Sequence, residues 1–132
     1  MIIQGYASIF NVKDLQNDII LPQSFTNIHQ CINSVPLLWQ HSVNKVIGSI
    51  ISINQNSIGL FIKANIYSST KFSSTACNGI KNGITSMSIG YKPITIYTDQ
   101  KTKIRHILKL QLLEVSIVTF AANPVSKIDY YY

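Results

Sequence analysis

Ser88 lies in a segment with an unusual pattern for a β-strand. The segment TSMSIGYKP, residues 85–93, alternates bulky side chains with small ones. The small residues on the face that carries Ser88 are Ser86 and Gly90, and they leave space for another backbone to lie alongside. A serine nucleophile that attacks an amide needs such space, and so does a barrel position at which two chain segments approach closely. The pattern therefore favours two interpretations, a nucleophile or a close packing contact.

A serine hydroxyl is a poor nucleophile unless a base takes its proton, and the usual base is histidine. The chain has three histidines, of which His29 lies on a candidate helix and His106 among basic residues of a candidate turn. His41 ends the segment VPLLWQH, in which alternate residues from Val35 onward are apolar and would share a strand face with it. An imidazole that emerges at the end of such a row is well placed to act as a base, although a half-buried structural histidine would look similar.

Glu114 is the only glutamate of the chain, and it continues the strand face formed by Leu108, Leu110 and Leu112. The other acidic residues lie in polar segments and are Asp14, Asp18, Asp99 and Asp129. A carboxylate on an apolar face is costly to desolvate without a partner. The pattern therefore predicts a partner for the Glu114 carboxylate. An inward lysine, a set of backbone amides, or a histidine that the carboxylate orients would each fit.

Length and composition predict one β-rich domain over residues 1–132. Apolar residues make up 46% of the chain and are spread in short runs, none of which approaches the roughly 20 residues of a membrane-spanning helix. The N-terminal residues lack the pattern of a secretory signal, which favours a cytoplasmic protein without a membrane partner. Cys31 and Cys77 are expected to be free thiols. A cysteine nucleophile, Cys77 with His41, is a weaker alternative, because Cys77 falls on a Ser-rich candidate helix without an activating feature.

The net charge of +6 raises the alternative of a small basic barrel that binds nucleic acid. Most basic residues are scattered, and the one group sits around a candidate turn where a solvated hairpin tip is the simpler interpretation. That group consists of Lys101, Lys103, Arg105 and Lys109. Such a protein also needs exposed aromatic residues along a basic groove, and the candidates are Phe61, Tyr97 and the terminal tyrosines.

The positioning elements are mainly strands. Residues 45–53 and 59–66 alternate around a turn-rich connection and predict an antiparallel hairpin, and residues 86–97 and 104–119 predict a second. Pro93 indicates an edge position or a bulge in the second hairpin. Two short helices are expected, one over about 22–33 after Pro22 and one over 70–82. The tail, KIDYYY, is expected to be a loose end.

Four blocks of the chain resemble, in order, the prohead maturation proteases of tailed phages. The blocks are GYASIFNVKDLQNDIILPQSF, VPLLWQHSVNKVIGSI, GITSMSIGYKP and LLEVSIVTFAANPVSKI. The resemblance implies a mainly β fold with a few helices, an antiparallel β-barrel of the herpesvirus-protease type. It also implies a serine endopeptidase that cleaves the scaffold segment of the major capsid protein, and itself, inside the procapsid in the bacterial cytoplasm.

The same resemblance places the catalytic pair at His41 and Ser88. Glu114 matches the family's glutamate and is the preferred third residue, whereas the herpesvirus relatives use a second histidine, which would favour His106 or His29. Backbone amides near Gly90 are candidates for the oxyanion site. No metal, nucleotide or other cofactor and no nucleic-acid partner is implied, and homo-oligomer formation is left open.

The chain departs from the family pattern after the first proline, where Gln23 and Ser24 replace the usual glycine and alanine. It also ends soon after the last block, without the charged extension of many members. The departure near the first helix bears on folding or substrate approach more than on chemistry. A non-catalytic descendant of the same fold, acting as a capsid or scaffold component, is a competing function.

Overall fold

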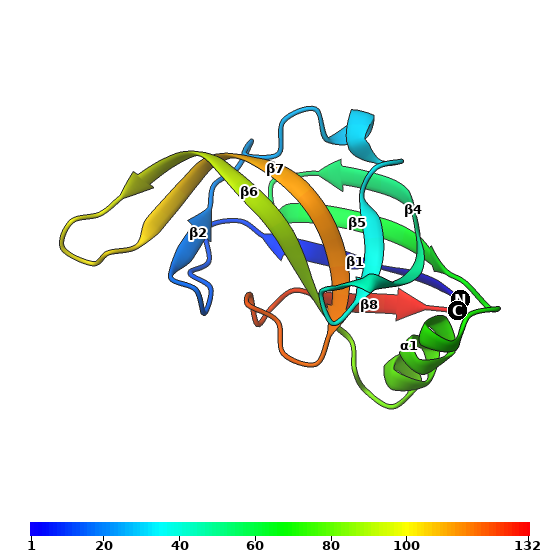
Figure 1. The fold of residues 1–132 in the computed structure, drawn as a ribbon. Helices are drawn as coiled ribbons and strands as arrows, with labels where there is room; N and C mark the ends of the chain where they lie inside the picture. The colour runs from blue at the N-terminus through cyan, green and yellow to red at the C-terminus, as the bar shows by residue number, and fades with distance from the viewer.

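The computed structural model describes residues 1–132, and its strands form one closed barrel (Figure 1). The elements are β1 (Ile2–Ile9), β2 (Asp18–Ile20), η1 (Ile28–Cys31), β3 (Pro36–Trp39), β4 (Ser42–Gln55), β5 (Gly59–Ile66), α1 (Lys71–Lys81), β6 (Ser86–Thr98), β7 (Arg105–Val118) and β8 (Lys127–Tyr131). The strand order is β2-β7-β3-β4-β5-β1-β8-β6, and an additional β6–β7 pairing closes the ring. The mainly β barrel predicted from the sequence is confirmed.

Both predicted hairpins are present, β4 with β5 and β6 with β7. The β6–β7 hairpin extends beyond the barrel wall as a two-stranded arm (Figure 1). Its register shifts between Pro93 and Thr95, which confirms the predicted bulge. One edge of β6 pairs with β7 along its length. The opposite edge pairs with β8 only at Ser86, so most of that edge has no strand partner.

Two strand pairings in the sheet are parallel, β2 with β7 and β3 with β7. Strand β3 runs parallel to β7, with Leu38 beside Ser116 and Trp39 beside Ile117. Strand alternation predicts that both strands exist but says nothing about which strands become neighbours. The consequence is that the turn after β3 lies against the C-terminal half of β7, which carries Glu114.

The barrel interior is filled by alternating apolar side chains from each strand. Strand β5 is the clearest case, because Leu60, Ile62, Ala64 and Ile66 are at most 1% exposed, as its alternation predicts. These residues belong to a cluster of 25 buried apolar residues. Burying a side chain of this kind stabilises the fold by about 1.5–3 kcal/mol for the larger residues.

The predicted helix over residues 22–33 is wrong, because only the short 3-10 helix η1 forms there. Gln23 and Asn27 adopt left-handed backbone conformations, with φ of 69° and 54°, and these interrupt a helix. The segment is instead held along β7, where the Ser24 hydroxyl donates to the Ile107 carbonyl at 2.9 Å and Phe25 forms a bridge with Leu110.

The second predicted helix, over residues 70–82, is confirmed as α1. It begins with a capping box in which Thr70 and Ser73 each accept a hydrogen bond from the other's backbone amide. Its buried residues Ala76 and Ile80 face the barrel, and Gly83 follows with φ of 98°. None of the helices is long and apolar enough to span a membrane.

The expectation of a loose C-terminal tail is wrong. Residues Lys127–Tyr131 form β8, which pairs antiparallel with β1, and Ile128 packs into the core at 7% exposure. Reciprocal backbone hydrogen bonds between Ile2 and Tyr132 place the two ends of the chain side by side (Figure 1). The apolar character of Ile128 is the signal in the sequence that marks this segment as a strand.

Candidate active site

His41 occupies a strained turn between β3 and β4. Trp39 and Ser42 pair across the turn, and the two residues between them, Gln40 and His41, have φ of 55° and 60°. Positive φ at both central residues is the geometry of a type I′ hairpin turn, which normally selects Asn or Gly. Neither residue is of that type, so surrounding contacts must hold the conformation. The prediction that His41 emerges where the strand ends is confirmed, but it does so from a left-handed turn.

Strand β7 and Thr119, the residue that follows it, supply the contacts that hold this turn. The Gln40 backbone amide donates to the Ile117 carbonyl at 3.0 Å. The Gln40 side-chain amide donates to the Thr119 hydroxyl at 2.7 Å, and its carbonyl accepts from the Thr119 backbone at 3.1 Å. The backbone amide of His41 donates to the Ser116 hydroxyl at 3.1 Å. Four hydrogen bonds therefore fix the backbone from which the imidazole projects.

Glu114 contacts His41, so the predicted partner of the carboxylate is a histidine. His41 Nδ1 is hydrogen-bonded to Glu114 Oε1, and the Ser116 hydroxyl donates to Oε2 at 2.7 Å. The glutamate side chain is 13% exposed and the imidazole 45%. A carboxylate that accepts from Nδ1–H leaves Nε2 as the nitrogen that can take a proton.

The small residues of β6 leave room for these β7 side chains. Gly90 is paired directly with Glu114, and Ser88 with Ser116. A Cβ atom placed on Gly90 would lie 2.6 Å from Glu114 Oε1 and 2.9 Å from its Cγ. Any larger residue at position 90 would therefore displace the carboxylate. The interpretation of the segment as a close packing contact is confirmed at Gly90, and the role of Ser88 as a nucleophile stays a prediction.

Ser88 and His41 line the same surface cleft. The cleft has a volume of about 520 Å³, and Gly90, Arg105 and Phe120 also line it. Ser88 is 6% exposed, and its hydroxyl is not hydrogen-bonded to His41 in this structure. Hydrogen bonds between a nucleophile and its base are often long before substrate binds. The arrangement brings together a serine hydroxyl, an imidazole with Nε2 available, and a carboxylate.

The alternative site residues lie elsewhere. His106 packs against Tyr97 at a centroid distance of 5.8 Å, on the β6–β7 arm, and His29 lies in η1. Cys77 lies in α1, and both it and Cys31 are free thiols, as predicted. None of these residues lines the cleft that holds Ser88 and His41.

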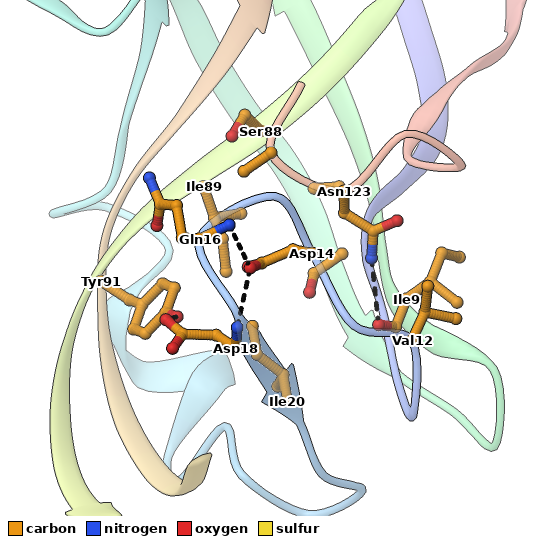
Figure 2. A pocket seen from close by; sticks show the side chains of 13 residues that line it. Ile9, Val12, Asp14, Gln16, Asp18, Ile20, Ser88, Ile89, Tyr91 and Asn123 are labelled. Carbon is orange, nitrogen blue, oxygen red and sulfur yellow. Dashed lines mark hydrogen bonds between the residues drawn. The ribbon is translucent and has the colours of Figure 1, made fainter. Parts of the chain in front are cut away.

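Sequence reasoning missed an ionic network around the buried Asp18 carboxylate, which lines a pocket together with Ser88 and Tyr91 (Figure 2). Asp18, placed in a polar loop by the sequence analysis, is 1% exposed and binds Arg105 Nε at 2.7 Å and Nη2 at 3.0 Å. The Tyr91 hydroxyl donates to the same carboxylate at 2.6 Å. Arg105 is therefore not simply a solvated residue of the hairpin tip. No local pattern marks this pairing, because Asp18 and Arg105 meet only through the parallel β2–β7 contact.

The same network contains a second buried carboxylate, Asp14, whose Oδ1 accepts backbone hydrogen bonds from Gln16 and Asp18 (Figure 2). Burial raises the pKa of Asp14, and the neighbouring Asp18 charge adds to this effect. Burial also acts to raise the pKa of Asp18, but hydrogen bonds from Arg105 and Tyr91 outweigh it and hold that pKa below its ordinary value. The two carboxylates therefore affect stability in opposite directions.

Asp18→Asn is expected to lower the free energy of unfolding at pH 7 by about 1–3 kcal/mol, because it removes hydrogen bonds to a charged partner that is itself half exposed. Since the folded pKa of Asp18 is lowered, its contribution is present above the unfolded carboxyl pKa and is lost as the pH falls through the folded pKa. Denaturant unfolding between pH 7 and pH 3 measures both effects.

Asp14→Asn is the matched control, because the amide oxygen can still accept both backbone hydrogen bonds while the buried charge is removed. Its stability at pH 7 is expected to equal or exceed that of the unmodified protein. Equal losses in the two variants would contradict the assignment of opposite roles.

Comparison with known proteins agrees with the fold. Residues 1–131 match the family described as caudovirus prohead serine protease. The chain is 30% identical over 125 residues to the prohead protease of Escherichia phage T5, and 29% identical over 129 residues to that of Enterobacteria phage HK97. Each match includes 92% of this chain but only 58% and 56% of the relatives, so the chain spans a little over half of their length.

Among solved structures, the barrel is similar to that of KSHV protease in complex with a hexapeptide phosphonate inhibitor. The TM-score is 0.57 at 12% sequence identity, over 99% of this chain and 64% of the other. This likeness supports the predicted herpesvirus-protease type of barrel. Because the family match extends over almost all residues, the chain belongs to the caudovirus prohead serine protease family.

Proposed function

We propose that this chain is a serine endopeptidase that cleaves the scaffold segment of a phage major capsid protein, and itself, inside the maturing procapsid. The observation that carries the proposal is the convergence of Ser88 and His41 on one cleft, with Glu114 bound to the imidazole. Family membership supports a role in capsid maturation.

In the proposed reaction, Ser88 Oγ attacks the scissile carbonyl carbon while His41 Nε2 takes the hydroxyl proton. The tetrahedral intermediate collapses as the same nitrogen gives that proton to the leaving amine, and an acyl-enzyme remains on Ser88. Water, deprotonated by His41, then attacks the acyl carbonyl, and the proton returns to Ser88 as the new carboxylic acid leaves. Backbone amides near Gly90 are the proposed donors to the oxyanion.

The proposed role of Glu114 is to hold His41 in one tautomer and to stabilise the imidazolium that forms twice in each cycle. Its low exposure, 13%, strengthens this interaction because little water competes for the carboxylate. We do not assign this role to His106 or His29, because neither contacts His41 nor lines the cleft.

The peptide substrate is proposed to bind in an extended conformation along β6. From Ser88 onward, the edge of β6 that faces away from β7 has no strand partner, so its backbone groups can pair with an added strand. Leu15 and Phe120 line the same cleft and are 78% and 87% exposed. These side chains offer apolar contacts to substrate residues near the scissile bond.

The proposal is tested by incubating the purified protein with procapsids whose major capsid protein retains its scaffold segment. We expect release of the scaffold segment, detected as a mass change of the capsid protein, together with fragments of the protease itself. An intact capsid protein after incubation with folded protein would support the competing function, a non-catalytic capsid or scaffold component.

The nucleic-acid alternative has less support from the structure. Its candidate aromatic residues do not share a surface, because Tyr97 lies on the β6–β7 arm and the terminal tyrosines lie at the opposite end of the molecule (Figure 1). Phe61 packs edge-on against Tyr6 in the wall between them. Binding to single-stranded DNA that weakens steeply with salt would revive this alternative.

A further inference from the structure

Ser116 is a second serine beside the proposed site, and it differs from Ser88 in its hydrogen bonds and in its access to the cleft. It lies on β7 directly opposite Ser88 and beside Leu38 of β3. Its exposure is 0% and it does not line the cleft, so a substrate cannot reach its hydroxyl. Its proton is already donated to Glu114. These facts argue against Ser116 as a nucleophile and raise the question of what its hydroxyl does.

The Ser116 hydroxyl joins the two other members of the site. It accepts a hydrogen bond from the His41 backbone amide at 3.1 Å and donates one to Glu114 Oε2 at 2.7 Å. The ring closes through the contact between His41 Nδ1 and Glu114 Oε1. The backbone, the imidazole and the carboxylate are therefore linked through one buried oxygen atom.

We propose that Ser116 is a positioning residue that holds the His41 ring and the Glu114 carboxylate in register, because its hydroxyl binds both the His41 backbone amide and Glu114 Oε2. The inference rests on the proposed protease function, because it assigns a task within that site. The residue acts through His41 and Glu114 and touches neither the substrate nor the reacting atoms.

Each hydrogen bond to Ser116 has a distinct physical effect. A hydroxyl has a single proton, and its donation to Oε2 fixes the rotation of the carboxylate so that Oε1 points to His41. The lone pair that accepts from the His41 amide helps to hold a turn residue at φ of 60°. Removing the hydroxyl frees the carboxylate to rotate and loosens the turn at the same time.

The expected consequence of Ser116→Ala is a fall in kcat with little change in KM. A base displaced by about 1 Å loses up to 100-fold in rate. Since Ser116 does not line the cleft, substrate binding should be unaffected. We expect kcat to fall by about 10- to 100-fold, and the low-field proton resonance of His41 Nδ1–H to shift or broaden.

Ser126→Ala is a matched control, because Ser126 is also 0% exposed and its hydroxyl has no hydrogen-bond partner. It removes an equally buried oxygen from outside the cleft, so kcat and the His41 resonance should be unchanged. Ser116→Thr keeps a hydroxyl at the same position and should retain most of the activity and the resonance.

Three measurements on these variants decide the proposal: kcat and KM with a peptide substrate, the His41 Nδ1–H resonance, and thermal unfolding. A folded Ser116→Ala variant with unchanged kcat and an unchanged resonance would overturn it, as would a loss shared equally by Ser126→Ala. If Ser116→Ala does not fold, a Ser116→Thr variant that folds but loses the resonance would also overturn it. Should the unmodified protein cleave nothing, the protease function fails, yet the resonance comparison still tests the role of Ser116.

Discussion

Replacing Ser88 with alanine is expected to abolish cleavage of the capsid protein and self-cleavage and to lower kcat by about 10⁴- to 10⁶-fold. The reason is that the cleft is lined by no other hydroxyl from which His41 could take a proton. The fold should survive, since the Ser88 hydroxyl makes no hydrogen bond within the chain and alanine adds no volume. Peptide cleavage and thermal unfolding, measured on the same preparation, check both parts of this expectation.

Ser86→Ala is the control for this prediction. Ser86 shares the strand face of Ser88 but pairs with Val118 and does not line the cleft. We expect Ser86→Ala to retain activity. If Ser86→Ala were inactive and Ser88→Ala active, Ser86 would have to be the nucleophile instead of Ser88.

The second large effect is expected for Glu114→Gln, which keeps the shape of the side chain but removes the charge that stabilises the imidazolium. Activity should fall by about 10⁴-fold, the scale seen when the orienting carboxylate of a serine protease is replaced by its amide. The fold should remain stable, because the partners of Glu114 are His41 and Ser116 and not a buried lysine or arginine.

A buried cation as the partner would give a different result. The substitution would then leave that charge uncompensated and lower the free energy of unfolding by about 3–5 kcal/mol. Thermal unfolding and peptide cleavage with Glu114→Gln distinguish the two cases. A variant that stays folded and fully active would remove Glu114 from the site and return attention to His106 or His29.

Sequence patterns predicted the elements of the barrel well where the physics is local. Period-two alternation located β4 and β5, and the apolar stripe of residues 70–82 located α1. The isolated carboxylate on the face of Leu110 and Leu112 predicted that Glu114 has a partner, because desolvation makes an unpaired buried charge costly. The structure shows that this partner, whose identity the sequence left open, is His41.

The features that were not predicted depend on which distant segments become neighbours. The parallel pairing of β3 with β7 places His41 next to Glu114, and the β2–β7 pairing places Asp18 next to Arg105. Neither follows from alternation, which is the same for any pairing. The helix expected over residues 22–33 fails for a related reason, since tertiary hydrogen bonds to β7 override a weak local stripe.

The left-handed turn at Gln40 and His41 was also not predicted from the sequence. Turn propensity points to Asn and Gly, and this turn contains neither. Hydrogen bonds that the turn donates to Ile117, Ser116 and Thr119 impose the conformation. Backbone strain of this kind concentrates at functional sites, where surrounding contacts over-determine the geometry.

Reaction with a fluorophosphonate tests the central claim most directly, because such a reagent phosphonylates only a serine whose proton a neighbouring base removes. Peptide mapping by mass spectrometry is predicted to find one adduct, on Ser88, in the unmodified protein and none in Ser88→Ala or His41→Ala. A folded protein that is labelled at Ser86 or Ser116, or that is not labelled at all, would contradict the account of Ser88 as a nucleophile activated by His41.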